Sequence, residues 1–196
     1  EMKVKRIRQL HDMSHDEVKA AVADGAVAIV PVGATEQHGY MPVGLDFFTC
    51  LYMAQCVAMA LQKVARGPQV IMAPGLPFGA SDHHVAYPGT ISLGGTMFAM
   101  VLGQILRELH RAGFRIVVVI NGHGGNENPI AAAVKDATSY CPGLAVHATT
   151  LHYLMGPGDW KKMHPDLPLP SSNTLSGELS ALINEGELSH ADAAHG

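Results

Sequence analysis

The residues Ala26-Val27-Ala28-Ile29-Val30-Pro31-Val32 are followed at once by Gly33-Ala34-Thr35-Glu36-Gln37-His38-Gly39, and this stretch decides the fold. Its apolar first half predicts a buried strand, and the glycines predict that a loop follows. Glu36 and His38 place a carboxylate and an imidazole on that loop, and Asp46 adds a second carboxylate shortly afterwards. Because open α/β sheets bind ligands at the carboxyl ends of their strands, we expect the functional site here.

Helical and strand patterns alternate along most of the chain. The pattern predicts helices over 15–24, 46–65, 96–111 and 127–139, and strands over 26–32, 69–73, 114–120 and 144–150. This alternation predicts an α/β fold, a three-layer α/β/α sandwich around a mostly parallel sheet with right-handed crossovers. We expect Met97 and Met100 to lie on the core-packing face of the third helix. A further helix is expected over 174–184.

Length and composition bound the possible functions. The 196 residues fit a single domain, and because the chain ends in a loop we expect its C-terminal part to be missing. The net charge of −4, without basic runs, speaks against binding to nucleic acid or an anionic membrane. We expect no signal peptide and no apolar run long enough to span a bilayer. Three cysteines without a C-x-x-C pair predict free thiols and a cytoplasmic protein.

A second histidine loop follows another buried strand. The run 114–120 leads into Asn121-Gly122-His123-Gly124-Gly125-Asn126, and a long loop over 74–95 favours a functional role. Two imidazoles and two carboxylates, Glu36, His38, Asp46 and His123, suit zinc, manganese or ferrous iron. Two ions are expected if Asp46 bridges them. Taken singly, each of these residues could instead be a surface or helix-capping residue, so the prediction depends on the joint pattern.

Three segments resemble the creatininase (creatinine amidohydrolase) family. They are Thr35-Glu36-Gln37-His38-Gly39, the segment 81–93 with its Pro88-Gly89-Thr90-Ile91-Ser92, and Asn121-Gly122-His123-Gly124-Gly125-Asn126. The resemblance covers roughly residues 25–150 and implies a creatininase-like α/β/α sandwich that assembles as a homo-oligomer, often a hexamer. Family members are metal-dependent amidohydrolases that open a lactam, remove a formyl group or trim a peptide during cofactor maturation.

The resemblance also implies roles for individual residues. It implies metal ligation by Glu36, His38, Asp46 and His123, with Asp46 bridging two divalent ions. Residues expected to contact substrate are Ser81, His84, Tyr87, Gly124, Gly125 and Asn126. The glycines would do so through N–H groups that stabilise an oxyanion. Trp160 could stack on a flat substrate ring or serve packing instead.

Two further groups are candidates for catalytic roles. Creatininase has a carboxylate two residues after the loop histidine, where this chain has Gly125, so Glu127 or a residue beyond Gly196 would have to replace it. His195-Gly196 is the best match to the start of the family's C-terminal motif, and His190 is the second. We assign the proton transfer to the leaving nitrogen to His195.

The sequence therefore predicts a metal-dependent hydrolase of amide C–N bonds in small molecules, cyclic amides among them. Its partner would be a small amide substrate, not a nucleic acid or a membrane. Two alternatives stay open: a hydrolase that trims a precursor peptide, and a non-catalytic relative that binds metal without turnover. An open groove around the loop over 74–95 would favour the peptide reaction, and a closed pocket the small amide.

Overall fold

The computed structural model describes residues 7–65 and 67–151 and is built on a five-stranded sheet of order β1-β3-β2-β4-β5. Every paired strand runs parallel to its neighbour. The strands are β1 (Arg8–Gln9), β2 (Val27–Val32), β3 (Val70–Met72), β4 (Ile116–Asn121) and β5 (Ala145–Thr150). The four predicted strands are confirmed. The sequence analysis did not predict β1, because a strand of two residues is too short to show a periodic pattern.

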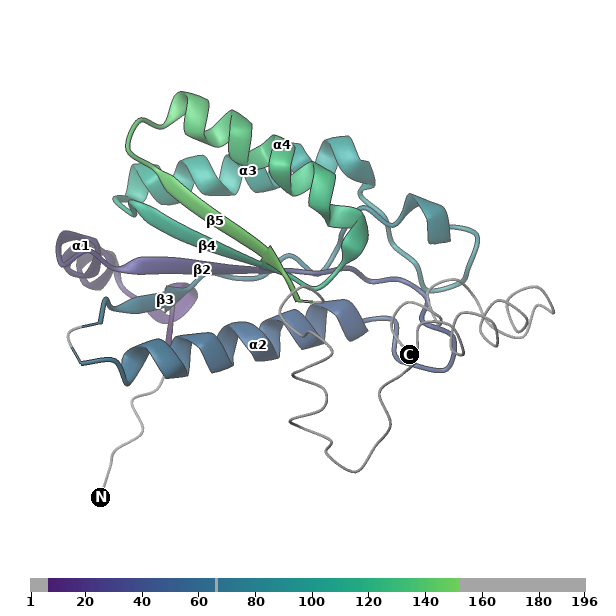
Figure 1. Ribbon diagram of the computed structural model, residues 1–196, viewed down its shortest axis with the longest axis horizontal. Coiled ribbons are helices and arrows are strands. Elements are labelled where there is room, and N and C mark those ends of the chain that lie inside the picture. The colour runs from purple at the N-terminus through teal and green to yellow at the C-terminus, as the bar shows by residue number, and fades with distance from the viewer. Residues whose placement is uncertain (1–6, 66, 152–196) are drawn as a thin grey trace, which may run out of the picture.

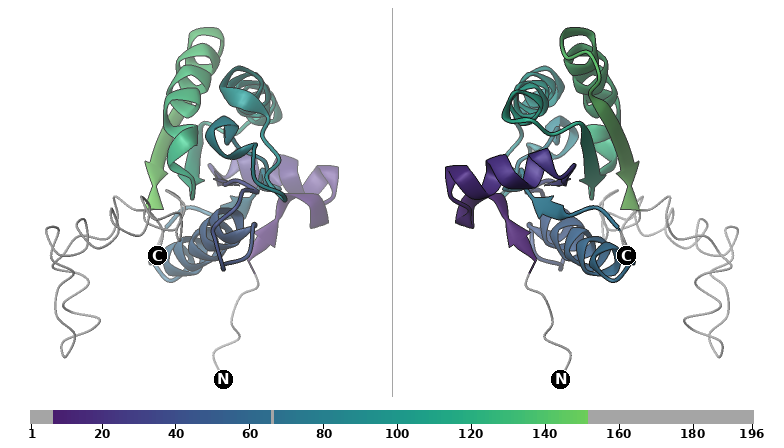
Figure 2. Two further views of the ribbon diagram at one scale, coloured as in Figure 1. Left: turned by 90° about the vertical axis from the view of Figure 1, so that its right-hand side faces the viewer. Right: turned by 90° about the vertical axis from the view of Figure 1, so that its left-hand side faces the viewer.

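The helices lie on both faces of this sheet. They are α1 (His15–Ala23), α2 (Leu45–Gln62), α3 (Gly94–Ala112) and α4 (Glu127–Tyr140). In Figures 1 and 2, α3 and α4 cover one face, and α2 covers the other. The predicted α/β/α sandwich with a parallel sheet is therefore confirmed. The helix expected over 174–184 lies outside the described residues.

The central strand β2 explains the apolar run that opens the sequence. All six of its residues are buried, because two hydrophobic clusters of the described residues lie on its opposite faces. Val30 and Val32 belong to the cluster under α3 and α4, whereas Ile29 belongs to the cluster under α2. A strand covered on both faces has no polar alternation, as in parallel sheets generally.

The prediction that Met97 and Met100 pack into the core is wrong. Both are exposed, at 56% and 69% of their surface, while Phe98, Leu102 and Leu106 of the same helix are completely buried. Apolar residues follow two neighbouring stripes of α3. The stripe with the aromatic and leucine side chains faces the sheet, and the methionine stripe faces outward.

The expectation that no apolar segment could span a bilayer also needs correction. By length and composition alone, α2 qualifies, with 18 residues and a mean hydropathy of 1.3. Core helices of sheet proteins pass the same test, and α2 packs against β2, β3 and β4. Its first turn also buries Asp46. We therefore describe α2 as the helix that covers one face of the sheet.

Pro31 occupies the central strand, where a proline removes one hydrogen bond of the ladder. On this side of β2, Ala73 N donates to Ile29 O, and Leu76 N donates to Pro31 O. A regular parallel ladder would use residue 75 for the second bond, so one extra residue lies in the segment that follows β3. The position of the missing N–H coincides with this interruption, which explains why the proline is tolerated.

The course of the chain makes a topological switch point at the carboxyl ends of β2 and β4. After β2 the chain passes through α2 to β3 on one side, then returns through α3 to β4 on the other side. The connections that leave the carboxyl ends of the adjacent strands β2 and β4 therefore run to opposite sides of the sheet. Such a switch point is where open α/β sheets bind ligands.

Candidate metal centre

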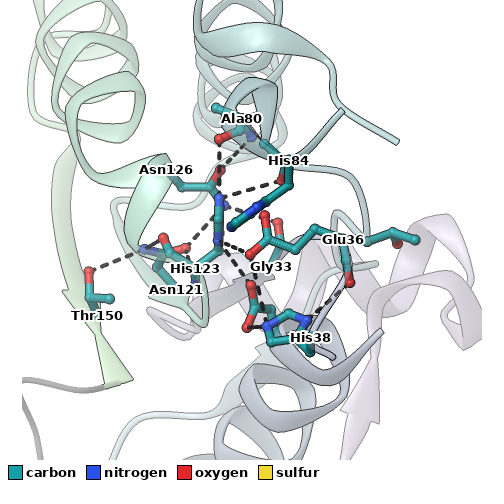
Figure 3. A network of polar contacts seen from close by, with 12 residues as sticks. Gly33, Glu36, His38, Ala80, His84, Asn121, His123, Asn126 and Thr150 are labelled. Carbon is teal, nitrogen blue, oxygen red and sulfur yellow. Dashed lines mark hydrogen bonds and ion pairs between the residues drawn. The ribbon is translucent and has the colours of Figure 1, made fainter. Parts of the chain in front are cut away.

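The four predicted ligands converge at this switch point. Figure 3 shows three of them, Glu36, His38 and His123, pointing toward one another. Asp46 lies between the two imidazoles: its Oδ1 is 3.1 Å from His38 Nε2, and its Oδ2 is 2.9 Å from His123 Nδ1. Glu36 Oε1 lies 3.3 Å from His123 Nδ1 and 3.9 Å from His38 Nε2. All four side chains are buried. The structure thus brings together residues that follow β2, begin α2 and follow β4.

Local hydrogen bonds orient His38 toward this centre. Its Nδ1 lies 3.0 Å from the backbone oxygen of Glu36, so Nδ1–H donates to that carbonyl. Its Nε2 lies 3.1 Å from Asp46 Oδ1 and faces the carboxylates, where it would ligate an ion after losing its proton. A ligating histidine that donates its other N–H to a backbone carbonyl is the usual arrangement around protein-bound metals.

His123 is oriented in the same way by a different loop. Its Nε2 lies 3.1 Å from Ala80 O, to which it donates, and this leaves Nδ1 facing Asp46 and Glu36. Asn121 fixes the backbone of His123 from both sides, because its Nδ2 donates to His123 O and its Oδ1 accepts from His123 N. The imidazole position is therefore set by β4 and by the segment after β3.

Asn126 joins the three loops that build the centre. Its Oδ1 accepts from Ala80 N at 2.9 Å, and its Nδ2 donates to Gly33 O at 3.0 Å and to Asn121 Oδ1 at 3.1 Å. The side chain is fully buried. Its amide is thereby occupied, which favours a role in positioning the loops over the predicted contact with substrate.

The two carboxylates dominate the electrostatics of the centre. Burial would raise the pKa of Asp46, but the contacts with His123 and His38 outweigh it and lower the pKa to about 2. Burial likewise opposes the net shift at Glu36, whose pKa is lowered by His123 and Ser81. Burial would lower the pKa of His123, but Asp46 and Glu36 raise it to about 10. The carboxylates are therefore ionised, and the cluster favours a positive charge beside them.

Several polar atoms of the centre are placed to bind a divalent cation and do not form hydrogen bonds of proper geometry with one another. Among the described residues, both Glu36 oxygens, Asp46 Oδ2 and His123 Nδ1 are buried without a hydrogen bond of proper geometry, although they lie close together. Donor atoms of Glu36, His38 and Asp46 lie within 4.8 Å of one another, and so do those of Glu36, His83 and His123. Hard oxygen and imidazole nitrogen donors suit zinc, manganese or iron.

Metal affinity is expected to rise with pH. With a pKa of about 10, His123 carries a proton at neutral pH when no ion is bound, and it must lose this proton to become a ligand. We expect about one proton to be released per protein at pH 7 on account of His123, and affinity to increase by up to about tenfold per pH unit. Zinc titration calorimetry in buffers of different ionisation enthalpy measures both quantities. Binding without proton release would contradict this assignment.

The other predicted residues lie around this centre in different ways. Ser81 is buried, with Oγ 3.5 Å from His123 Nε2, and His84 Nδ1 lies 3.3 Å from Gln37 Nε2. Tyr87 is 46% exposed, with its ring edge-on to His84. These positions leave the predicted substrate contacts as predictions.

The remaining predicted residues follow His123 or lie in the C-terminal segment. Gly124 and Gly125 belong to the short 3-10 turn Gly124–Asn126, and Glu127 begins α4. Trp160 and His195 lie outside the described residues, so their roles stay predictions.

The glycine at position 125 has a steric cause. A Cβ atom there would overlap the backbone oxygen of Ala80 and the Nε2 atom of His123. The close approach of the two loops thus excludes any side chain, and with it the carboxylate that creatininase carries at this position. Sequence comparison alone could show the departure but not its reason.

The structure also adds His83, which the sequence analysis did not select. His83 lies in the 3-10 turn Asp82–His84, and its ring is parallel to that of His123, with centroids 5.8 Å apart. Neighbouring histidines in the 74–95 loop were the only signal in the sequence. The choice between them required the fold.

The comparisons with known proteins agree with this arrangement. The family model described as creatinine amidohydrolase matches residues 11–194. This chain belongs to the creatininase family. A crystal structure of creatinine amidohydrolase superposes with a TM-score of 0.71 at 27% identity, covering 84% of this chain and 66% of that one. Other creatininase structures that superpose are titled as a manganese form and as a mutant of Zn-Zn type.

Curated members of the creatininase family have different named activities. The mycofactocin precursor peptide peptidase of Mycolicibacterium smegmatis is 37% identical over 128 residues, 65% of this chain and 47% of the relative. That of Mycobacterium tuberculosis is 30% identical over 185 residues, 82% of this chain and 73% of the relative. The creatinine amidohydrolase of Pseudomonas putida is 35% identical over 122 residues, 59% of this chain and 44% of the relative. The chain thus spans about half the length of the first and third relatives.

Proposed function

We propose that this protein is a metal-dependent amidohydrolase that cleaves an amide C–N bond. The observation that carries the proposal is the buried cluster of two carboxylates and two imidazoles, in which both Glu36 oxygens, Asp46 Oδ2 and His123 Nδ1 lack hydrogen bonds of proper geometry. Buried polar groups are normally hydrogen-bonded, so such a cluster indicates a site built for a cation. Its place at the switch point of the sheet supports a site open to substrate.

The residues of the chain divide the work of this reaction. Glu36, His38, Asp46 and His123 would hold the ions. Bound divalent ions lower the pKa of water and polarise a carbonyl, which is the chemistry that amide hydrolysis requires. The backbone N–H groups of Gly124 and Gly125 are the candidates to donate to the carbonyl oxygen as it becomes negative. His195 is the candidate for proton transfer to the departing nitrogen, and Glu127 is the candidate to replace the carboxylate that position 125 lacks.

The first candidate substrate class is a small amide, with cyclic amides included. The creatinine amidohydrolase relative and the structural neighbours named creatininase support this class. The second candidate is a peptide, which the names of the two mycobacterial relatives support. Exposed apolar side chains near the ligand loops, Tyr40 and Val85 among them, are compatible with either class. We further propose a soluble, cytoplasmic homo-oligomer, in keeping with the sequence-based expectation.

A substrate panel with metal control tests the proposal. Purified protein loaded with zinc or manganese is expected to hydrolyse one class among creatinine, other lactams, formamides and short peptides. Dialysis against a chelator should remove at least about 99% of that activity, and returning the metal should restore it, because the metal supplies the reactive water. Release of amine measured for each class identifies the substrate. Two bound equivalents of metal with no turnover of any class would favour the non-catalytic alternative.

A further inference from the structure

We infer that His83 is an additional ligand of this metal centre, completing a second group of donors with Glu36 and His123. The inference rests on the proposed metal centre but concerns a residue outside the four predicted ligands. Donor atoms of the three residues lie within 4.8 Å of one another. A single ion can therefore contact all three with small side-chain movements.

The need for a further donor follows from the ligand count. Glu36, His38 and Asp46 form one group of three. On the other side, Glu36 and His123 alone supply two residues, with Asp46 shared between both sides. Catalytic zinc sites usually have three protein ligands and an open position. The imidazole of His83 brings the second group to three residues, with Glu36 common to both groups and Asp46 lying between them.

The position used by creatininase for a further carboxylate cannot serve here. Gly125 has no room for a side chain, because a Cβ atom would overlap Ala80 O. The loop that blocks this position is the loop that carries His83, three residues after Ala80. The same close approach that excludes a carboxylate from residue 125 therefore brings an imidazole toward the centre.

The turn that carries His83 is held firmly. Ala80 N donates to the buried Asn126 side chain, Ser81 N donates to Ser92 Oγ, and His84 N donates to Ser81 O. A side chain on a fixed turn loses little further freedom when it binds an ion. The two partners it would join, Glu36 and His123, are 1% and 2% exposed and present atoms without hydrogen bonds of proper geometry.

His83 itself is exposed. It would therefore occupy the solvent side of its ion, while Glu36 and His123 lie on the buried side. This arrangement leaves the ion reachable from solvent. It also makes His83 suitable for substitution, because removal of an exposed side chain disturbs packing little.

Zinc binding by variants of the full chain tests the inference. Competition with a chromophoric chelator gives stoichiometry and both affinities for the wild type, His83→Ala and the control His15→Ala, which removes an exposed imidazole at the start of α1. We expect His83→Ala to bind one ion at least about tenfold more weakly, since loss of even an outer partner of a metal ligand costs roughly 10–100-fold. The other ion and the control should be unaffected.

Two further measurements separate ligation from an indirect effect. The visible spectrum of the cobalt-substituted protein should change in His83→Ala and not in His15→Ala, and His83→Glu, which keeps a donor, should recover part of the affinity. Equal thermal stability of all variants in chelator would show that folding is intact. Unchanged zinc affinities and cobalt spectra in His83→Ala would overturn the role of His83 while leaving the proposed function standing. Failure of the wild type to bind zinc, manganese or iron would overturn both.

Discussion

Asp46→Ala is expected to abolish binding of both metal ions and to lower kcat by at least roughly 10³-fold. The carboxylate presents one oxygen to His38 and the other to His123, at 3.1 and 2.9 Å, so it belongs to both sides of the centre. Removal of a single electrostatic contact in an active site already costs about 10²–10³-fold in kcat. Metal analysis after gel filtration, together with steady-state kinetics on the substrate that the panel identifies, measures both effects.

The matched control for this experiment is Asp16→Ala. Asp16 is an exposed acid in the first turn of α1, as Asp46 is a buried acid in the first turn of α2. Its removal should leave metal content and activity unchanged. If Asp46→Ala kept two equivalents of metal, the carboxylate would not bridge the ions. The interpretation that its contacts with His38 and His123 mark a shared ligand would then be wrong.

Asn126→Ala is expected to destabilise the protein by roughly 3–5 kcal/mol. The substitution removes one acceptor and two donors, and it leaves Ala80 N, Gly33 O and Asn121 Oδ1 with one partner fewer in a buried place. A buried polar group that loses its partner costs about 1–3 kcal/mol. Urea unfolding of the metal-free protein, followed by circular dichroism, measures the change in the free energy of unfolding.

Asn128→Ala provides the comparison, because Asn128 is an exposed amide two residues further along the same segment. Its effect should stay within about 0.5 kcal/mol, as for most surface substitutions. A loss below about 1 kcal/mol in Asn126→Ala would mean that the loops around the centre hold their positions without this amide.

Much of this fold could be read from the sequence because its strands are strong signals. β2 and β4 are apolar runs that end in glycine-rich loops, and the parallel arrangement follows from the helices between them. The candidate ligands could also be identified from the sequence, because Glu36, His38 and His123 come directly after these two strands. The carboxyl ends of β2 and β4 are adjacent, so these residues can be predicted to lie close together without information on side-chain packing.

The features that could not be predicted from the sequence depend on contacts between residues far apart in the chain. The inward face of α3 was misjudged because Met97 and Phe98 both belong to apolar stripes, and only packing against the sheet selects one. The candidate role of His83 depends on how the chain after β3 returns to the centre. The same return explains Gly125, whose missing side chain is dictated by a carbonyl 45 residues earlier in the chain.

Pro31 in β2 is linked to the path of the chain after β3, which leads back to the metal centre. The extra residue opposite Pro31 is a β-bulge in the pairing between β2 and the chain beyond β3, since Leu76 and not residue 75 donates to Pro31 O. Because one residue is inserted, Leu76 and not residue 75 lies opposite Val32, and the side chain of Leu76 takes the face that residue 75 would otherwise have used. A single imino acid in the middle of the sheet thus coincides with a one-residue shift in the register of the chain that leads toward Ala80.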